Sequence, residues 1–241
     1  MCGIVGYIGD KNAVEVIMAG LHRLEYRGYD SAGIAVIREH SLESVKSLGK
    51  LNVLDQRITE TAIQGPLGIG HTRWATHGAP SEVNSHPHYD MPMEIAVVHN
   101  GIIENFQELR HMLESDGVVF RSQTDTETLA HLVRKHYQGD LFRAVQRALK
   151  DVVGAYAIGV VCKNNPDVLV AARHGSPLII GLGNEEAFIA SDVPAIMKYT
   201  RNIIYLDNGQ VCEIRRGGYA IEDLEGQPIS PKIEQVNWDD S

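Results

Sequence analysis

The second residue of the chain is a cysteine, and its position gives it a chemistry that an internal cysteine lacks. Met1 precedes Cys2 and Gly3 follows it. An initiator methionine is removed when the next residue is small, so maturation would leave Cys2 with a free α-amino group. Such an amine titrates at about 7.7–8.0 and can take a proton from the neighbouring thiol. Position 2 therefore predicts a nucleophile with its own base, although a small core residue at the start of a strand is the alternative.

A pair of hydrogen-bond donors follows the apolar segment 95–99. Asn100 offers a side-chain N–H, and Gly101 leaves its main-chain N–H open to a ligand because it has no Cβ. Two such donors at the end of a strand can hold the negative oxygen that develops when a carbonyl is attacked. An ordinary Asn-Gly turn is the alternative for these two residues.

Two further segments contain groups suited to the two ends of an amino acid. Arg73, Trp74, Thr76 and His77 lie together in the run HTRWATHG. Arginine can bind a carboxylate through two parallel hydrogen bonds, and tryptophan can cover a small ligand. Asp125 precedes a predicted helix, where it would either cap that helix or pair with a ligand ammonium. Arg73 and Asp125 together would recognise an α-amino acid.

The histidines and cysteines raise the question of a metal site. Five histidines lie near these motifs: His71, His77, His86, His88 and His99. The sequence has no HExxH pattern and no paired cysteines, which are the usual signs of zinc ligands. We therefore expect no metal and no cofactor, and a metal-dependent hydrolase is the weaker alternative. The three cysteines are far apart and predict no disulfide framework.

Composition excludes several classes of partner. The chain has 241 residues, 44% of them hydrophobic, and a formal net charge of −9 without a run of Lys and Arg. Nucleic acid binding needs clustered basic residues to displace counterions, so we expect none. No segment reaches the 18 or so apolar residues of a membrane span, and the N-terminus lacks the features of a signal peptide. We expect a cytoplasmic protein with no membrane association.

The elements that must position these residues follow from hydrophobic spacing. Helical spacing predicts helices over 11–25 and 104–115, from about 126 to before 139, and over 140–150. Short β-branched segments predict the strands 2–8, 32–37, 68–71, 95–99, 156–162, 168–172, 178–181, 188–191 and 203–206. The turn Asp207-Asn208-Gly209 predicts a hairpin between its two flanking segments. Strands joined mostly by hairpins, with four helices in two pairs, predict two packed sheets covered by helices.

Taken in order, the motifs resemble the glutaminase domain of the glutamine:fructose-6-phosphate amidotransferases. The resemblance covers essentially the whole chain to about residue 225, and several long motifs in this order make it specific. The segments that show the resemblance are MCGIVG (1–6), EYRGYDSAG (25–33), HTRWATHG (71–78), HPH (86–88), HNGIIEN (99–105) and DTE (125–127). A related purine-type amidotransferase shares the N-terminal cysteine and HNG but lacks the other motifs.

The resemblance implies a fold and a set of catalytic roles. The fold would be α+β, an N-terminal nucleophile hydrolase fold with a four-layer αββα sandwich of two mainly antiparallel sheets. Cys2 would attack the side-chain amide of L-glutamine, and Asn100 and Gly101 would hold the oxyanion. Arg73 would bind the substrate carboxylate and Asp125 its ammonium.

The same resemblance implies four supporting residues and a domain arrangement. Thr76 and His77 would line the pocket, Trp74 would lie at its lid, and Arg27 would support the Cys2 end. Residues 1–225 would form the glutaminase domain, and 226–241 a linker towards an isomerase part that would act on fructose 6-phosphate. The full-length enzyme would be a homo-oligomer. A purine-type glutaminase or a non-catalytic glutamine-sensing domain is the alternative.

Overall fold

The structure, a computed structural model, describes residues 2–237. The removal of Met1 therefore concerns a residue outside the described range. One set of strands comprises β1 (Gly3–Ile8), β2 (Ser31–Arg38), β3 (Ser41–Leu48), β4 (Leu67–Arg73), β9 (Ile179–Leu182), β10 (Ala187–Ala190), β11 (Asn202–Tyr205) and β15 (Glu234–Gln235). They form an eight-stranded sheet in the order β15-β11-β9-β10-β1-β4-β2-β3.

A second sheet packs on the first. Its strands are β5 (His88–Tyr89), β6 (Ile95–Asn100), β7 (Tyr156–Cys162), β8 (Leu169–His174), β12 (Gln210–Arg215), β13 (Gly218–Asp223) and β14 (Pro228–Ile229). They form a seven-stranded sheet in the order β14-β13-β12-β8-β7-β6-β5. Neighbouring strands such as β1 and β4, or β6 and β7, pair antiparallel.

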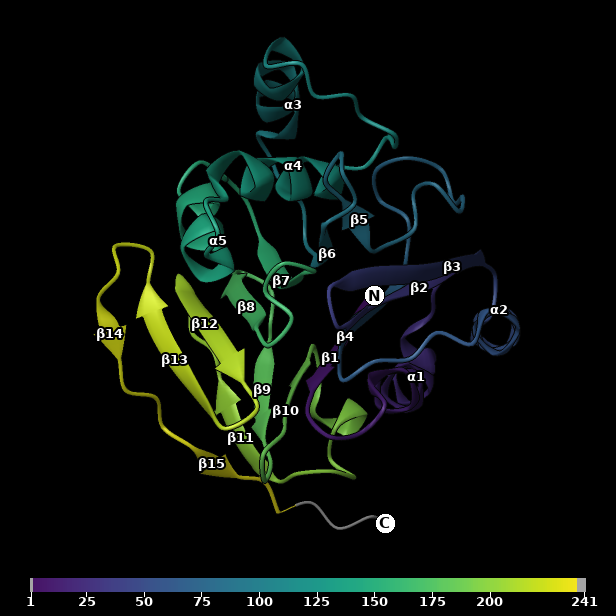
Figure 1. Cartoon of the computed structure of the whole chain (residues 1–241), viewed down its shortest axis with the longest axis vertical. Coiled ribbons are helices and arrows are strands. Elements are labelled where there is room, and N and C mark those ends of the chain that lie inside the picture. Colours follow the sequence, from purple (N-terminus) through teal and green to yellow (C-terminus); the bar gives the residue numbers. More distant parts are fainter. Residues whose placement is uncertain (1, 238–241) are drawn as a thin grey trace.

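Helices cover the outer face of each sheet. They are α1 (Ala13–Arg23), α2 (Leu51–Thr61), α3 (Phe106–Ser115), α4 (Thr126–His136) and α5 (Leu141–Leu149), with short 3-10 turns at Glu25–Arg27 and Val193–Ala195. Helix α1 packs on β1 and β4, whereas α4 packs on β6 and α5 on β12. Figure 1 shows α1 and α2 on one side of the paired sheets and α3, α4 and α5 on the other.

Successive side chains of a strand point to opposite faces of its sheet, and this alternation produces three apolar layers: one between the two sheets and one between each sheet and its helices. In β1, Ile4 and Ile8 point between the two sheets, while Val5 and Tyr7 point towards α1. This two-residue period is the geometry of any extended strand, and a strand buried on both faces is apolar at successive positions. The four-layer αββα sandwich of two mainly antiparallel sheets, implied by the resemblance, is confirmed.

The predicted helices and strands are present with small shifts of their ends, but α2 and β3 were missed, as were β13 and the two-residue strands β5, β14 and β15. Helix α2 buries only Leu51 and Leu54 fully, so its apolar spacing is too sparse to signal a helix. Strand β3 has an exposed or half-buried side chain at most positions. Both lie at the edge of the eight-stranded sheet, where little apolar surface needs to be covered.

The predicted hairpin at Asp207-Asn208-Gly209 is wrong. The strand before it, β11, pairs with β9, whereas the strand after it, β12, pairs with β8 and β13 in the other sheet. Asn208 Oδ1 accepts a hydrogen bond from Gly175 N (2.7 Å), and Gly209 N donates to Arg173 O (2.9 Å). The turn is thus fixed to the end of β8, and it takes the chain from one sheet to the other.

The tail predicted as a linker from residue 226 packs on both sheets in its described part. Ile229 pairs with Ile221 on β13, and Glu234 with Ile203 on β11. Val236 is buried.

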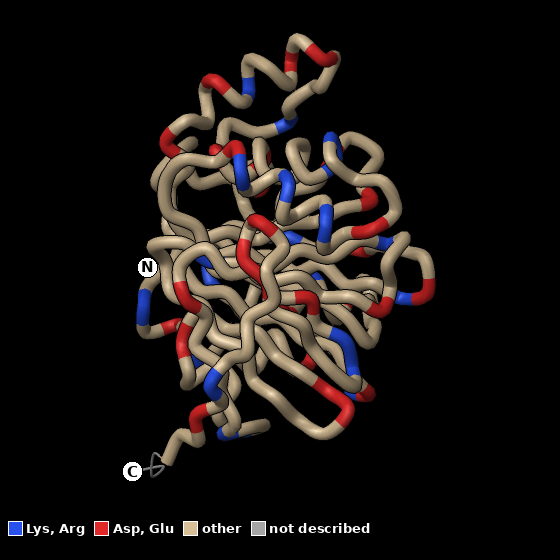
Figure 2. The backbone as a smooth tube through the Cα atoms, turned by 90° about the vertical axis from the view of Figure 1, so that its left-hand side faces the viewer, with Lys and Arg blue, Asp and Glu red and all other residues tan. Residues whose placement is uncertain are grey.

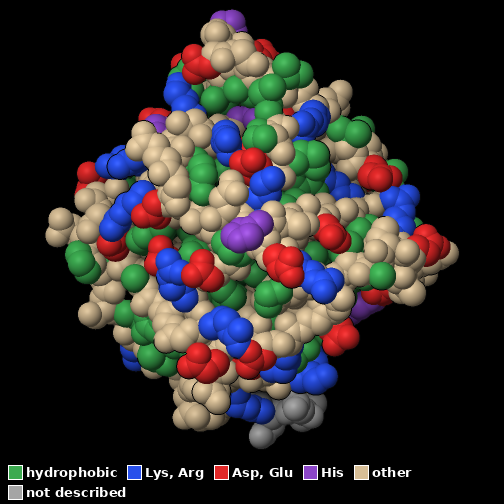
Figure 3. All heavy atoms as spheres, in the orientation of Figure 1, with side chains coloured by type: hydrophobic (Ala, Val, Ile, Leu, Met, Phe, Trp, Pro, Cys, Tyr) green, Lys and Arg blue, Asp and Glu red, His purple; other side chains and the backbone are tan. Residues whose placement is uncertain are grey.

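The surface mixes charges and apolar groups. Figure 2 shows segments with Lys and Arg interleaved with segments with Asp and Glu. On the face in Figure 3, hydrophobic side chains form scattered patches between charged ones. None of the described helices combines the length and the apolar character needed to cross a bilayer.

Candidate active site

A cavity of about 510 Å³ lies where the start of β1 meets the ends of β4 and β6. It therefore receives residues from both sheets. All nine residues singled out in the sequence line it: Cys2, Arg27, Arg73, Trp74, Thr76, His77, Asn100, Gly101 and Asp125. Seven further lining residues are His86, His99, Ile102, Thr124, Thr126, Ser176 and Pro177.

Cys2 is half-buried and its thiol contacts the main chain of Trp74. Trp74 N donates to Cys2 Sγ (3.2 Å), and Cys2 Sγ lies 3.6 Å from Trp74 O. Burial raises the pKa of the thiol, and the hydrogen bond from the Trp74 main chain only partly opposes this. The thiol is therefore protonated at neutral pH, and nucleophilic attack requires a base.

Asn100 ends β6 and reaches across to the other sheet. Its Nδ2 donates to the main-chain oxygen of Cys2 (3.2 Å). A primary amide has two N–H groups, so a second one can be donated to a ligand in the cavity. Gly101 follows with φ of +124°, and a Cβ there would collide with the main-chain oxygen of Ala155. Glycine is therefore required for the backbone path beside Asn100.

Arg73 ends β4 and is 3% exposed. Its Nη2 donates to the main-chain oxygens of His77 (2.5 Å) and Gly78 (3.0 Å), and its Nη1 to that of Ala79 (3.4 Å). The guanidinium therefore fixes the loop that follows it. A guanidinium has five N–H groups, so others can still meet a carboxylate in the cavity.

The loop after β4 forms one wall of the cavity. Ala75 N donates to Asp30 Oδ2 (2.6 Å), which ties the loop to the start of β2. Trp74 is 56% exposed, and Thr76 is also exposed. The His77 ring packs edge-on against Phe106 at the start of α3, with 5.0 Å between the ring centroids. Trp74 and Thr76 can thus move against a ligand more freely than the buried Arg73.

Arg27 also lines the cavity. Its Nη1 donates to Ser191 Oγ (3.2 Å), and the same oxygen accepts from Ile4 N (3.0 Å). Arg27 is thereby connected to the strand that begins beside Cys2.

Asp125 precedes α4, but its side chain does not cap that helix. Its Oδ2 accepts instead from Ile103 N (2.8 Å), which connects α4 to the chain after Gly101. The carboxylate is 4% exposed and lines the same cavity as Arg73. A buried carboxylate with a single main-chain donor can accept further hydrogen bonds from a cation.

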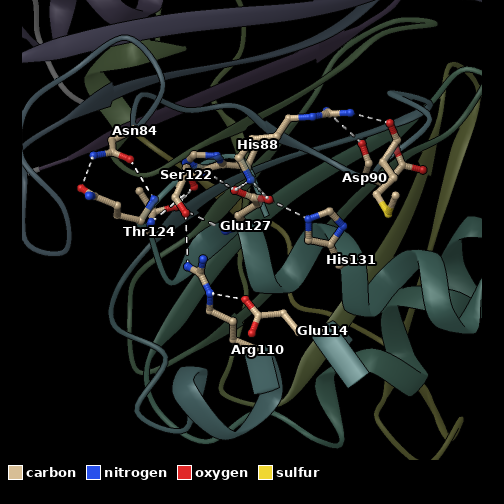
Figure 4. Close-up of polar contacts among 12 residues, drawn as sticks. Asn84, His88, Asp90, Arg110, Glu114, Ser122, Thr124, Glu127 and His131 are labelled. Atoms are coloured by element: carbon tan, nitrogen blue, oxygen red, sulfur yellow. Dashed lines mark hydrogen bonds and ion pairs between the residues drawn. The ribbon is translucent and has the colours of Figure 1, made fainter. Parts of the chain in front are cut away.

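Figure 4 shows a buried network around Glu127, at the start of the helix that Asp125 precedes. Glu127 accepts from Ser122 N (2.6 Å) and from His131 Nε2 (2.7 Å). Burial alone would raise the pKa of Glu127, but these hydrogen bonds hold it below its ordinary value. Thr124, next to Asp125, is hydrogen-bonded to His88 Nε2 (2.9 Å). The chain is therefore rigid on both sides of Asp125.

The histidines in and behind the cavity wall are buried and neutral. The rings of His71 and His86 stack 3.9 Å apart, and His88 meets His86 edge-on. Burial lowers the pKa of His71 to about 3, and it lowers those of His86, His88 and His99 as well. Among residues 2–237, no group of three or more His, Cys, Asp or Glu side chains is arranged to hold a metal ion.

Several residues of the cavity were not predicted from the sequence. Thr124 and Thr126 flank Asp125, so the sequence could have indicated them as neighbours of a site residue. Ser176 and Pro177 lie between β8 and β9 in no recognisable motif. His71 and Asp30 do not line the cavity, and only the hydrogen bonds show that they act on residues that do.

Comparison with known proteins agrees with this geometry. The chain is 51% identical to glutamine–fructose-6-phosphate aminotransferase (isomerizing) of Caldanaerobacter subterraneus, over 99% of its own length and 39% of the relative. It is 55% identical to the protein of the same name from Thermus thermophilus, again over 99% of the chain and 39% of the relative. The chain thus spans about two fifths of the length of these curated relatives.

Solved structures support the fold. Glutamine phosphoribosylpyrophosphate amidotransferase from B. subtilis superposes with a TM-score of 0.81 at 27% identity, over 92% of this chain and 49% of that one. The N-terminal nucleophile hydrolase fold implied by the resemblance is therefore confirmed. A family model described as a glutamine amidotransferase domain matches residues 71–198, more than half of the 241 residues. The chain belongs to this family of glutamine amidotransferase domains.

Proposed function

We propose that the chain hydrolyses the side-chain amide of L-glutamine to glutamate and ammonia, with Cys2 as nucleophile. The observation that supports this most strongly is the convergence of Cys2, Asn100, Arg73 and Asp125 on one cavity from distant parts of the sequence. Arg73 binds the α-carboxylate and Asp125 the α-ammonium, which leaves the γ-amide to reach the thiol. Trp74, Thr76 and His77 close around the substrate, and Arg27 supports the Cys2 end.

The reaction takes place in two steps. With Met1 removed, the α-amine of Cys2 accepts the thiol proton, and the sulfur attacks the amide carbon. The oxygen of the tetrahedral intermediate accepts hydrogen bonds from Asn100 Nδ2 and Gly101 N. The protonated amine then transfers its proton to the departing ammonia, and a γ-glutamyl thioester remains. Water attacks the thioester with the same amine as base, and glutamate and the free thiol are regenerated.

In the whole protein, we propose that the ammonia serves the conversion of fructose 6-phosphate to glucosamine 6-phosphate. The activity for which the relatives at 51% and 55% identity are named supports this acceptor. We further propose that 1–225 is the amidotransferase domain and that 226–241 leads to an isomerase part, in a homo-oligomeric enzyme of the cytoplasm. The purine-type alternative is not favoured, because the phosphoribosylpyrophosphate enzyme is only 27% identical.

The test measures glutamate release by protein whose intact mass shows that Met1 is absent. Wild-type protein should release glutamate, and iodoacetamide but not a chelator should stop it. Cys2→Ala should bind glutamine without turnover, whereas Cys212→Ala, which alters a buried cysteine outside the cavity, should remain active. Glutamine binding without turnover by mature wild-type protein would instead support a sensing domain.

A further inference from the structure

His71 lies behind the cavity and connects the two sheets. It belongs to β4, is fully buried, and does not line the cavity itself. Its Nε2 lies 3.0 Å from the main-chain oxygen of His99 and 3.0 Å from Asn100 Oδ1, both on β6 of the facing sheet. The side chain therefore reaches the amide of Asn100 from the side opposite Cys2.

The partners of His71 determine its protonation state. A main-chain oxygen can only accept, so Nε2 carries the proton and donates it to both oxygens. Nδ1 is buried and has no hydrogen-bond partner among the described residues. Because burial lowers the pKa of His71 to about 3, the ring stays neutral at any pH at which the thiol could react.

The neutral Nε2–H form has a direct consequence for Asn100. The two ends of an amide side chain have nearly the same shape, so only hydrogen bonds decide which one faces the cavity. His71 can stabilise only the oxygen on its side, which leaves Nδ2 facing the main-chain oxygen of Cys2. A reversed amide would place an oxygen where the negative oxygen of the intermediate develops.

We propose that His71 is a positioning residue that fixes the rotation of the Asn100 amide, so that Nδ2 is ready to stabilise the oxyanion. This inference rests on the proposed glutaminase function. His71 touches no substrate and acts only through Asn100.

The ring of His71 is itself held in place. It stacks on His86 with 3.9 Å between centroids and 8° between planes. His86 Nδ1 accepts a hydrogen bond from His99 N (3.2 Å), so the strand that carries Asn100 also fixes the stacking partner. This closed set of contacts leaves His71 little freedom to rotate, which is a condition for precise placement of a donor.

Four variants test the proposal in mature protein: His71→Phe, His71→Gln, Asn100→Ala and the double variant His71→Phe/Asn100→Ala. His71→Phe keeps a stacked ring but has no N–H, and it should lower kcat by about 10–100-fold with KM for glutamine nearly unchanged. His71→Gln places an N–H near the former Nε2 and should restore most of kcat. In the double variant, loss of His71 should add little to the effect of Asn100→Ala, because both changes remove the same interaction.

Alkylation of Cys2 by iodoacetamide separates positioning from general damage. This substitution at a saturated carbon forms no oxyanion, and Cys162 and Cys212 are buried. His71→Phe should therefore alkylate at the wild-type rate while its glutamine turnover falls. Independent, additive losses in the double variant, or an equal loss of alkylation, would assign His71 a purely structural role and overturn the proposal.

The wild-type protein provides a test that does not depend on a variant folding. Nitrogen chemical shifts of the His71 imidazole should show the neutral Nε2–H tautomer, unchanged between pH 5 and pH 9. A proton on Nδ1, or titration in this range, would contradict the inference. Absence of turnover in mature wild-type protein would instead refute the proposed function, and the shifts would still report on the tautomer.

Discussion

Asn100 donates a hydrogen bond from Nδ2 to the main-chain oxygen of Cys2, 3.2 Å away, although 98 residues separate them in sequence. The bond joins the residue just before β1 of one sheet to the last residue of β6 in the other. It places the proposed oxyanion donor directly beside the proposed nucleophile. The relative position of the two sheets therefore determines whether these residues can act together.

The protonation of Cys2 makes its reactivity depend on what precedes it. Burial raises the pKa of the thiol above its ordinary value, so the reactive thiolate is scarce at neutral pH. With an extra residue kept before Cys2, alkylation by iodoacetamide should be slow at pH 7.5 and rise about tenfold per pH unit. Mature protein should react faster at pH 7.5 because its α-amine accepts the proton. Equal rates in both forms, measured by mass spectrometry, would contradict the role of the amine.

Arg73→Lys should weaken glutamine binding. Lysine keeps the charge, but its three N–H groups cannot hold three main-chain oxygens of the following loop and also bind a carboxylate through two parallel hydrogen bonds. We expect KM for glutamine to rise by about 10–100-fold, with a smaller fall in kcat. Arg143→Lys, in a surface ion pair with Glu222, is the matched control and should change neither. An unchanged KM for Arg73→Lys would argue against carboxylate binding by this residue.

Asp125→Asn should reduce recognition of the α-ammonium. The asparagine oxygen can still accept from Ile103 N, so the local backbone should be retained. The informative comparison is between glutamine and 5-amino-5-oxopentanoate, which lacks the α-ammonium. Wild-type protein should prefer glutamine in kcat/KM, and the variant should lose about 10–100-fold of that preference. If the preference were the same in both proteins, another group would have to bind the ammonium.

Gly101→Ala should abolish turnover and destabilise the fold. The position has φ of +124°, and the added Cβ would collide with Ala155 O. Gly117→Ala provides the matched control, since Gly117 has φ of +93° with no atom within 4 Å of the added Cβ. The control should lose about 1–3 kcal/mol of stability from backbone strain but keep its activity. Urea unfolding measures the effect on stability, and glutamate release measures the effect on activity. An active Gly101→Ala protein would show that Ala155 O does not lie as close to position 101 as the structure has it.

Acid should destabilise the protein through its buried histidines. His71 has a pKa of about 3 in the native state, against about 6.5 in an unfolded chain. Between these values the unfolded state binds a proton that the native state does not, so stability falls as the pH falls. For His71 this amounts to up to about 1.4 kcal/mol per pH unit, in the window from about pH 6.5 down to about pH 3.

Urea unfolding at pH 7, 6 and 5 tests this dependence. His71→Gln has no titrating ring, so its unfolding free energy should fall less steeply with pH than that of the wild type. His22→Gln alters a half-exposed histidine whose pKa is raised, against the effect of its burial, by hydrogen bonds to Asp55 and Glu25. In this control, the unfolding free energy should fall with decreasing pH at least as steeply as in the wild type. The same steepness in His71→Gln and wild type would show that His71 is not buried as a neutral ring.

Local sequence was sufficient for elements that bury a continuous apolar face. Helix α1 and strand β1 could be predicted because their spacing is the direct geometric consequence of burial on one or two sides. Helix α2 was missed because it lies at an exposed edge. The turn at Asn208 was wrongly predicted to join two paired strands. A turn motif specifies only a local change of direction, whereas the pairing of β12 with β8 places β12 in the other sheet.

The sequence by itself determined the chemistry available to this protein. The cysteine at position 2, the Arg73 and Asp125 motifs and the Asn100-Gly101 pair identify the reacting and binding groups, because these depend on residue type and order. Only the tertiary structure decided that all of them reach one cavity and that His71 acts on Asn100 from behind it. The physical reason is that these contacts join two different sheets, and their relative placement depends on packing across the whole apolar core.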